Sequence, residues 1–348
     1  EKQGKLDQVT SQWSDFEAQR KDLLGSISEI RDQLENASVK SSTLDGVKDL
    51  GNQIRGLEQK LEGHSGEYQQ FRDLSRQLMS SDPANIARTQ SALSGVDNEW
   101  ERLQALLTEK ENLTESVASQ WQQYNDTKNT VTQVLSGVES VLGEEETLAS
   151  QPDVRKSLDK YKSSELELSS HQRQLDYLST RGKQLASDAR SLPGFDPAPL
   201  REEVQDCGSR WQAGQQGLAQ GREHLEEQVV LWEQIDATRE EVTAWLDTTV
   251  HKLQDNSDNF GDAVSVKGNL QKYKSEVPYF EEAFDTLHRR MATLQEASGA
   301  PALPELQELQ ARMDEQFARA AELSEGLEDK VEEFTEQRQG LERQMEEE

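Results

Sequence analysis

One apolar pattern recurs along the chain at a nearly constant interval, and tryptophans mark it. The interval from Trp100 to Trp211 is the same as the interval from Trp121 to Trp232. Trp13 precedes Trp121 by almost the same interval. Self-similarity at a fixed spacing is the signature of a chain built from tandem copies of one structural unit. The pattern therefore predicts several copies of one small fold rather than a single large domain.

Each copy contains three apolar stripes with the spacing of bundled helices. The first stripe, helix A, starts at Trp13, Trp121 or Trp232 and advances by alternating steps of three and four residues. Helix C carries Trp100 and Trp211 at one equivalent position, where the third copy has Phe317. Helix B lies between A and C, and its stripes are His64, Tyr68, Phe71 and Leu78, then His171, Leu175, Leu178 and Leu185, then Phe280, Phe284, Leu287 and Leu294.

The prolines agree with this division, because proline cannot continue a helix interior. Seven of the eight fall at predicted turns, namely Pro83, Pro152, Pro193, Pro197, Pro199, Pro301 and Pro304. Pro278 is the exception, inside helix B of the third copy, and is expected to kink that helix or to mark a late start. No proline interrupts residues 85–151 or 200–277. Helix C of one copy is therefore expected to run directly into helix A of the next.

The predicted fold is all-α, with three tandem three-helix bundles joined by continuous linker helices into an extended rod. We expect the copies to occupy residues 1–113, 114–224 and 225–348. Helices of roughly 30 residues would make each copy about 45 Å long, at about 1.5 Å per residue. A long parallel dimeric coiled coil is a rival reading, but the clustered prolines weigh against it.

The composition excludes several functional classes. The chain has 67 acidic and 38 basic residues, a net charge of −29, which repels nucleic-acid phosphates and anionic lipid headgroups. No apolar run approaches the roughly 20 residues that would span a bilayer, and the first residues do not resemble a signal peptide. The single cysteine, Cys207, excludes a disulfide framework and fits a reducing cytoplasm. Low hydrophobicity would also fit disorder, but the regular apolar spacing favours a folded chain.

Three helices in each copy, an early tryptophan in A, a mid-helix tryptophan in C and fused C–A junctions resemble the spectrin repeat. The third copy matches best, with Trp232 followed by Trp245 and Leu246, whereas the first has Ile27 in place of Leu246. The resemblance implies a cytoskeletal linker, similar to nesprins first and plakins second. It implies a cytoplasmic, cytoskeleton-associated chain that could reach the outer nuclear envelope through a parent protein.

The residues singled out are structural rather than catalytic. A tryptophan on a helical seam is usually core, so we assign the core to Trp13, Trp100, Trp121, Trp211, Trp232, Trp245 and Phe317. Arg20, Lys128 and Arg239 recur at one position of helix A. Their stems are expected to lie along the seam while the charges reach solvent or an acid of helix B or C; a basic docking row is the rival reading.

No catalytic, cofactor or metal site is predicted. The histidines form no zinc-binding spacing, and His64 and His171 are interpreted as packing residues at equivalent places. Cys207 is expected to be a small buried hydrophobe. Glycines are expected to soften two helices, because each costs about 1 kcal/mol relative to alanine, so that these helices would exchange amide hydrogens fastest: Gly208, Gly214, Gly217 and Gly221 in one, and Gly46, Gly51, Gly56, Gly63 and Gly66 in the other.

These observations predict a non-enzymatic rod segment that spaces, bears tension and offers lateral faces to cytoskeletal proteins. The alternative is a specific docking module in which one copy or junction binds a cytoskeletal regulator. Neither reading involves nucleic acid or direct membrane insertion, and the isolated piece is expected to be monomeric.

Overall fold

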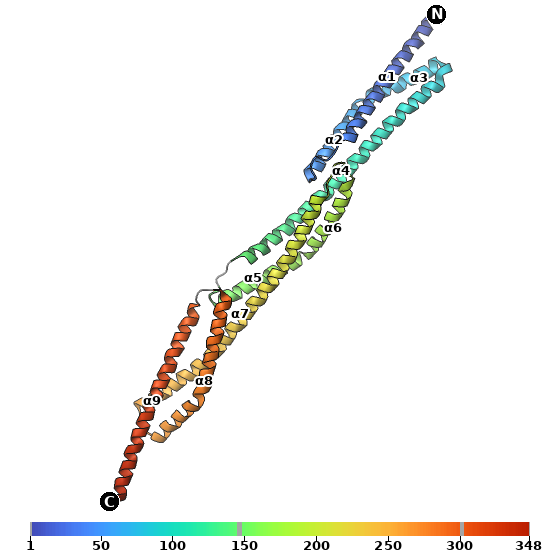
Figure 1. Ribbon diagram of the computed structural model, residues 1–348. Coiled ribbons are helices and arrows are strands. Elements are labelled where there is room, and N and C mark those ends of the chain that lie inside the picture. Colours follow the sequence, from blue (N-terminus) through green and yellow to red (C-terminus); the bar gives the residue numbers. More distant parts are fainter. Residues whose placement is uncertain (1, 145–147, 300–302, 348) are drawn as a thin grey trace. The chain divides into compact units, whose positions relative to one another are not determined.

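The computed structural model describes residues 2–144, 148–299 and 303–347, and within these ranges all regular structure is helical (Figure 1). The helices are α1 (Lys2–Asn36), α2 (Leu44–Gly63), α3 (Ser65–Ser81), η1 (Pro83–Asn85), α4 (Ile86–Gly143), α5 (Gln151–Ser170), α6 (Gln172–Asp188), η2 (Ala189–Ser191), α7 (Ala198–Asp258), α8 (Ala263–Ser298) and α9 (Pro304–Glu347). The predicted all-α class is confirmed. Pro301, expected at a turn, lies outside the described residues.

Two helices are far longer than the others, and they confirm the predicted continuity of helix C into helix A. α4 has 58 residues and contains both Trp100 and Trp121. α7 has 61 residues and contains both Trp211 and Trp232. The chain divides into two compact units, residues 1–135 with 170–212, and residues 136–169 with 213–348. Both long helices therefore contribute to both units.

The core of the first unit comes from the predicted seams. In its N-terminal bundle, α1 supplies Phe16 and Leu23, α3 supplies Phe71 and Leu78, and α4 supplies Val96, all nearly inaccessible to solvent. Burying side chains of this size contributes about 1.5–3 kcal/mol each. The alternating three- and four-residue steps therefore place one face of each helix inside the bundle.

The second unit contains two apolar clusters. The larger joins α5, α7, α8 and α9 around buried Trp232, Leu246, Leu287 and Met313. The smaller joins the end of α7 to α8 and α9 through Leu253, Leu270 and Leu327. These clusters cover the third predicted copy along most of its helices.

Two of the three middle helices are interrupted at a histidine. α2 ends and α3 begins at His64, whose φ and ψ are −86° and 1°. α5 ends and α6 begins at His171, whose φ and ψ are −98° and 8°. Both values lie in the sparsely populated bridge region, which an α-helix does not use. The interpretation of these histidines as packing residues missed this break: both are half-buried and mark the point where helix B is interrupted.

The third middle helix, α8, is continuous through Pro278. It begins at Ala263, capped by the Asp262 side chain on the backbone N–H groups of Val264 and Ser265. Of the two alternatives expected for Pro278, the late start is therefore wrong, and the kink stays a prediction. The helix ends at Ser298 and is capped by Gly299, whose φ of +63° is the left-handed conformation that glycine adopts readily.

Three of the glycines in α7 have packing partners that the sequence did not reveal. A Cβ added at Gly217 would lie 2.9 Å from Leu142 of α4, and one at Gly214 would lie 3.1 Å from Val138. A Cβ at Gly221 would overlap the ring of Tyr161 on α5. These glycines allow neighbouring helices to approach, so their intrinsic cost is offset by close packing. The expected fast hydrogen exchange of this segment stays a prediction.

No helix in the described ranges is long and apolar enough to cross a membrane.

Candidate functional site: the junction beside Trp121

The aromatic residues selected from the sequence fall into two groups by exposure. Trp100, Trp121, Trp211 and Trp232 are buried. The other three are partly exposed but pack against a core, and they are Trp13, Trp245 and Phe317. Three indole N–H groups donate hydrogen bonds at 3.0 Å, Trp13 to Asp82, Trp211 to Gln172 and Trp245 to Glu276.

The recurring basic residues of helix A behave differently from one another. The Lys128 ammonium lies 3.1 Å from the Glu203 carboxylate, so this pair links α4 to α7. Arg20 instead contacts Glu17 at 3.3 Å, on the same helix. Arg239 contacts Asp236 at 3.2 Å, also on the same helix. Exposed pairs of this kind contribute about 0–1 kcal/mol, so they orient side chains more than they stabilise the bundle.

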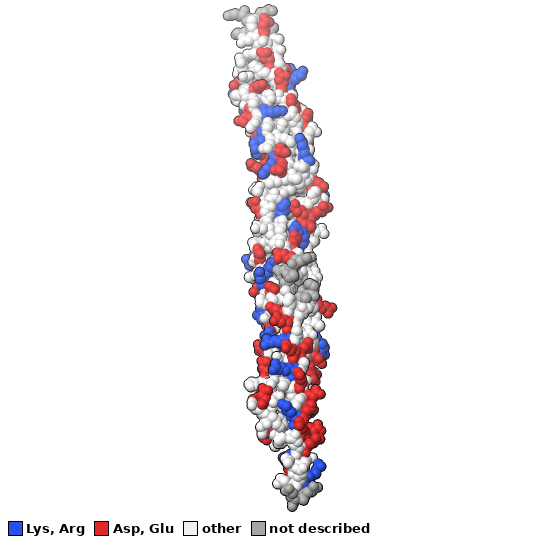
Figure 2. All heavy atoms as spheres, turned by 90° about the vertical axis from the view of Figure 1, so that its left-hand side faces the viewer, with Lys and Arg blue, Asp and Glu red and all other residues white. Residues whose placement is uncertain are grey.

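Figure 2 shows acidic and basic side chains interspersed on the visible face, without a continuous basic row. The docking-row reading of Arg20, Lys128 and Arg239 stays a prediction.

Two loops that are far apart in the sequence are joined beside Trp121. The first, residues 37–43, connects α1 to α2, and the second, residues 192–197, connects η2 to α7. The Val39 N–H donates to the Pro193 carbonyl at 2.8 Å. The Asp196 N–H donates to the Ser42 hydroxyl at 2.7 Å. We call these two loops, with Trp121, the junction.

Apolar side chains fill the junction between the hydrogen bonds. Trp121 of α4 meets Phe195 edge to face, with ring centroids 5.6 Å apart, a favoured aromatic arrangement. Val39, Leu192 and Phe195 are buried, so the loops contribute to the core. Separating the two loops would break these hydrogen bonds and expose the apolar side chains between them, and the junction therefore resists separation of its loops.

Gly194 is the residue that the junction requires at its centre. Its φ of +77° lies in the left-handed region, where side chains are disfavoured. A Cβ there would also lie 2.9 Å from the Val39 carbonyl oxygen. Sequence reasoning did not identify this residue, although the dipeptide Pro193–Gly194 is a turn signal.

Polar groups next to the junction are satisfied by α7. The Tyr124 hydroxyl donates to Glu203 at 2.8 Å. Burial is the main cause that raises the pKa of Tyr124, and the Glu203 carboxylate raises it further. Burial also raises the pKa of the Cys207 thiol, with a further contribution from Glu203. The protonated, buried thiol is a poor nucleophile. In the part of the chain that the structure describes, no three His, Cys, Asp or Glu side chains are grouped to hold a metal ion.

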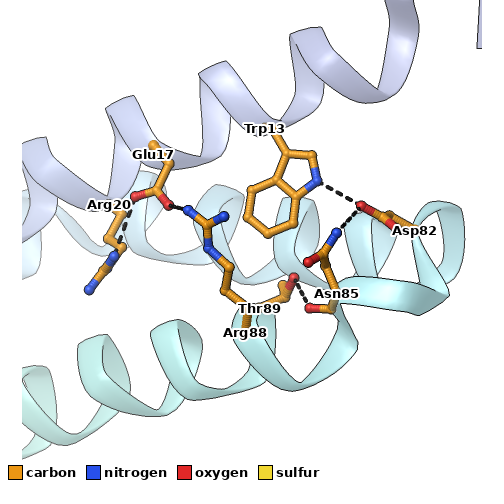
Figure 3. A network of polar contacts seen from close by, with 7 residues as sticks. All are labelled: Trp13, Glu17, Arg20, Asp82, Asn85, Arg88 and Thr89. Atoms are coloured by element: carbon orange, nitrogen blue, oxygen red, sulfur yellow. Dashed lines mark hydrogen bonds and ion pairs between the residues drawn. The ribbon is translucent and has the colours of Figure 1, made fainter. Parts of the chain in front are cut away.

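A second polar network lies at the start of α4 (Figure 3). The Trp13 indole donates to Asp82, which also accepts from Asn85 at 2.8 Å. The Arg88 guanidinium lies over the Trp13 ring, 4.8 Å from its centroid, and contacts Glu17 at 3.0 Å. This network closes the end of the N-terminal bundle by joining α1, the η1 turn and α4.

The helical repeats, their seams and the fused helices define a class of structural proteins. The Spectrin repeat family profile matches residues 11–115 and 119–227. The chain belongs to the spectrin-repeat family.

Particular relatives place the chain beside giant proteins of this family. It is 22% identical to Muscle-specific protein 300 kDa of Drosophila melanogaster over 353 residues, covering 99% of the chain and 3% of that protein. It is 20% identical to Nesprin-2 of Mus musculus over 274 residues, covering 79% of the chain and 4% of that protein. Nesprin-2 of Homo sapiens is 19% identical over the same coverage. The predicted resemblance to nesprins is confirmed, and the chain spans only a few per cent of these relatives.

Proposed function

We propose that this chain is a spacing and tension-bearing segment of a cytoskeletal linker. Membership of the spectrin-repeat family supports a structural role. In this proposal the chain acts as three repeats, residues 1–113, 114–224 and 225–348, in an extended rod. It works as a monomeric, non-enzymatic segment in the cytoplasm. Its similarity to Nesprin-2 supports association with the cytoskeleton.

The observation that carries the proposal is the combination of the unbroken helix α4 with the junction beside Trp121. α4 carries residues of two successive repeats on one hydrogen-bond ladder. The two junction loops are joined by hydrogen bonds between residues far apart in the sequence, such as Ser42 and Asp196. A load that opens one repeat must therefore also break contacts of the next one.

Single-molecule stretching of the full chain tests this coupling. We expect the first two repeats to open together in the native chain. Gly194→Ala should separate them into two smaller events, because alanine is strained at this φ and crowds Val39. Gly56→Ala is the matched control, since a Cβ at Gly56 meets no atom within 4 Å. Identical unfolding patterns in the native chain and the Gly194→Ala variant would contradict the proposal.

A second candidate function is docking of a specific protein on one repeat. The observation that favours it is a groove on the second repeat, between α6 and α7, which contains two basic residues without acidic partners in the described part of the chain. Binding experiments with the full chain distinguish this function from pure spacing, as described next.

A further inference from the structure

We propose that the groove between α6 and α7 binds an acidic amphipathic helix of a separate protein. The groove encloses about 600 Å³. α6 contributes Gly182 and Lys183, and α7 contributes Arg201, Val204 and Gly208. All of these residues lie in one compact unit, so a single packed body forms the groove.

The groove is open at Gly208, whereas Gly182 lets Val204 pack closely against α6. At Gly208, a Cβ would meet no atom within 4 Å, so this part of α7 faces open space. At Gly182, a Cβ would overlap a methyl group of Val204, which packs against the glycine backbone. Val204 remains half-buried and leaves apolar surface accessible in the groove. An apolar side chain of a partner would remove this surface from water at about 25 cal/mol per Å².

The charges beside the groove select an acidic partner. Lys183 and Arg201 are exposed, and within the described ranges neither forms an ion pair or a side-chain hydrogen bond. Two unpaired cations at one apolar groove are unusual in a chain with 67 acids and 38 bases. Nearby Lys128, by contrast, is paired with Glu203. Complementary charge across an interface favours the correct partner and rejects like-charged ones.

The spacing of the lining residues suits a helix. Arg201, Gln205 and Gly208 are four and three residues apart and share one face of α7 over two turns. Seven residues of helix rise about 10 Å. A partner helix can present apolar side chains three or four residues apart over this length, with carboxylates on either side. The inference rests on the docking part of the proposed function, whereas the spacing role does not depend on it.

Fluorescence anisotropy with the full chain tests the charge preference. The probe is a labelled helical peptide of about four turns, with leucines three and four residues apart and glutamates elsewhere. The comparison peptide has lysine in place of every glutamate. We expect the glutamate peptide to bind and the lysine peptide not to bind. The double variant Lys183→Glu, Arg201→Glu should weaken binding of the glutamate peptide at least about tenfold and allow the lysine peptide to bind.

Two further variants separate the groove from general effects of charge. The double variant Lys21→Glu, Lys48→Glu changes the net charge by the same amount as the groove variant, but on α1 and α2. It should leave peptide affinity unchanged. Gly208→Leu should fill the groove and weaken peptide binding about tenfold, while the melting temperature stays equal or rises, because leucine favours the helix and open space receives it.

Three outcomes would overturn the proposal. One is absence of glutamate-peptide binding by the native chain, and another is equal binding by the groove variants. The third is concentration-dependent self-association that the Lys183→Glu, Arg201→Glu variant abolishes, because the occupant would then be a second copy of this chain. Unchanged stretching behaviour in any of these cases would leave the proposed spacing function standing.

Discussion

The N-terminal and C-terminal bundles solve the same packing problem with aromatic residues on different helices. In the N-terminal bundle, Trp100 of α4 stacks on Tyr68 of α3, with centroids 4.4 Å apart and an interplanar angle of 5°. In the C-terminal bundle, Trp245 of α7 stacks on Phe280 of α8, at 4.3 Å and 10°. The indole thus comes from helix C in one bundle and from helix A in the other.

The substitution is reciprocal. Phe317 stands in the third copy where the first two copies have tryptophan, and its ring centroid lies 6.0 Å from that of Trp245. The spacing between Trp13 and Trp232 makes Ser26 the N-terminal equivalent of Trp245. A smaller aromatic residue on helix C is therefore accompanied by a larger one on helix A. In both of these bundles a flat aromatic pair packs against the middle helix, but a different helix supplies the indole.

The largest expected effect is that of Trp100→Ala. Removing this buried ring should lower the free energy of unfolding of the N-terminal bundle by about 3–5 kcal/mol. Phe317→Ala should cost the C-terminal bundle less, because Phe317 is partly exposed and Trp245 covers its ring. Denaturant unfolding followed by circular dichroism measures both. An equal or larger loss in the Phe317 variant would mean that helix C is the main anchor in both bundles.

A smaller effect is expected when Trp245 is replaced by the residue of the N-terminal bundle. Trp245→Ser should destabilise the C-terminal bundle by about 2–3 kcal/mol, since this indole is partly exposed. Adding Phe317→Trp should recover part of the loss, because it returns the indole to helix C. The same unfolding measurement applies, with Phe317→Trp alone as the control. A double variant no more stable than Trp245→Ser would show that the two positions do not compensate.

The middle helices provide a third comparison, with an effect of opposite sign. α8 contains Pro278, whereas α3 contains no proline. Pro278→Ala restores a backbone N–H donor and should stabilise the C-terminal bundle by about 1–2 kcal/mol, less than the full cost of an interior proline because the native packing accommodates it. Pro83→Ala, at the η1 turn, is the control and should bring no gain. Loss of stability in the Pro278 variant would indicate that the packing of α8 depends on the proline.

The smallest expected effect concerns acid sensitivity. Hydrogen bonds from Asn85 and then Trp13 hold the pKa of the Asp82 carboxyl below its ordinary value. A lowered folded-state pKa stabilises the protein above the unfolded value, near pH 4, and this contribution is lost as the pH falls through the lowered value. The N-terminal bundle should therefore lose stability slightly on acidification from pH 5 to pH 3 through this group.

Urea unfolding at several pH values measures the effect. Asp82→Asn should reduce the loss of N-terminal stability between pH 5 and pH 3, and Trp13→Phe should reduce it in part. A steeper loss in the Asp82 variant than in the native chain would show that this carboxylate does not contribute as its contacts suggest.

The seams were predictable from the sequence because they depend on local periodicity alone. Phe16, Val131, Leu246 and Leu287 are buried as the three- and four-residue steps indicated. The fused helices were predictable because no proline interrupts residues 85–151 or 200–277, which form nearly all of α4 and α7. His171 carried no comparable signal, since the helix breaks after two serines with neither glycine nor proline beside it.

The junction could not be derived from local patterns. Its hydrogen bonds join loops that lie in different repeats, and their pairing depends on how two repeats meet. Gly194 is recognisable as a turn residue, but the contact with Val39 that makes glycine necessary appears only in three dimensions. The groove beside Gly208 could not be predicted either, because a glycine within a helix was interpreted only as lowering the stability of that helix.

Because α4 is unbroken, the side chains of its two halves have a fixed rotation about the helix axis relative to each other. Each residue of an α-helix turns the chain by about 100°, because 3.6 residues complete a turn. Inserting one residue between Leu107 and Val117 would thus rotate every later side chain of α4 by that angle relative to the earlier ones, whereas inserting seven would nearly restore the original azimuth. The number of residues between successive seams therefore sets the angle between the faces that α4 presents to any partner that binds along them.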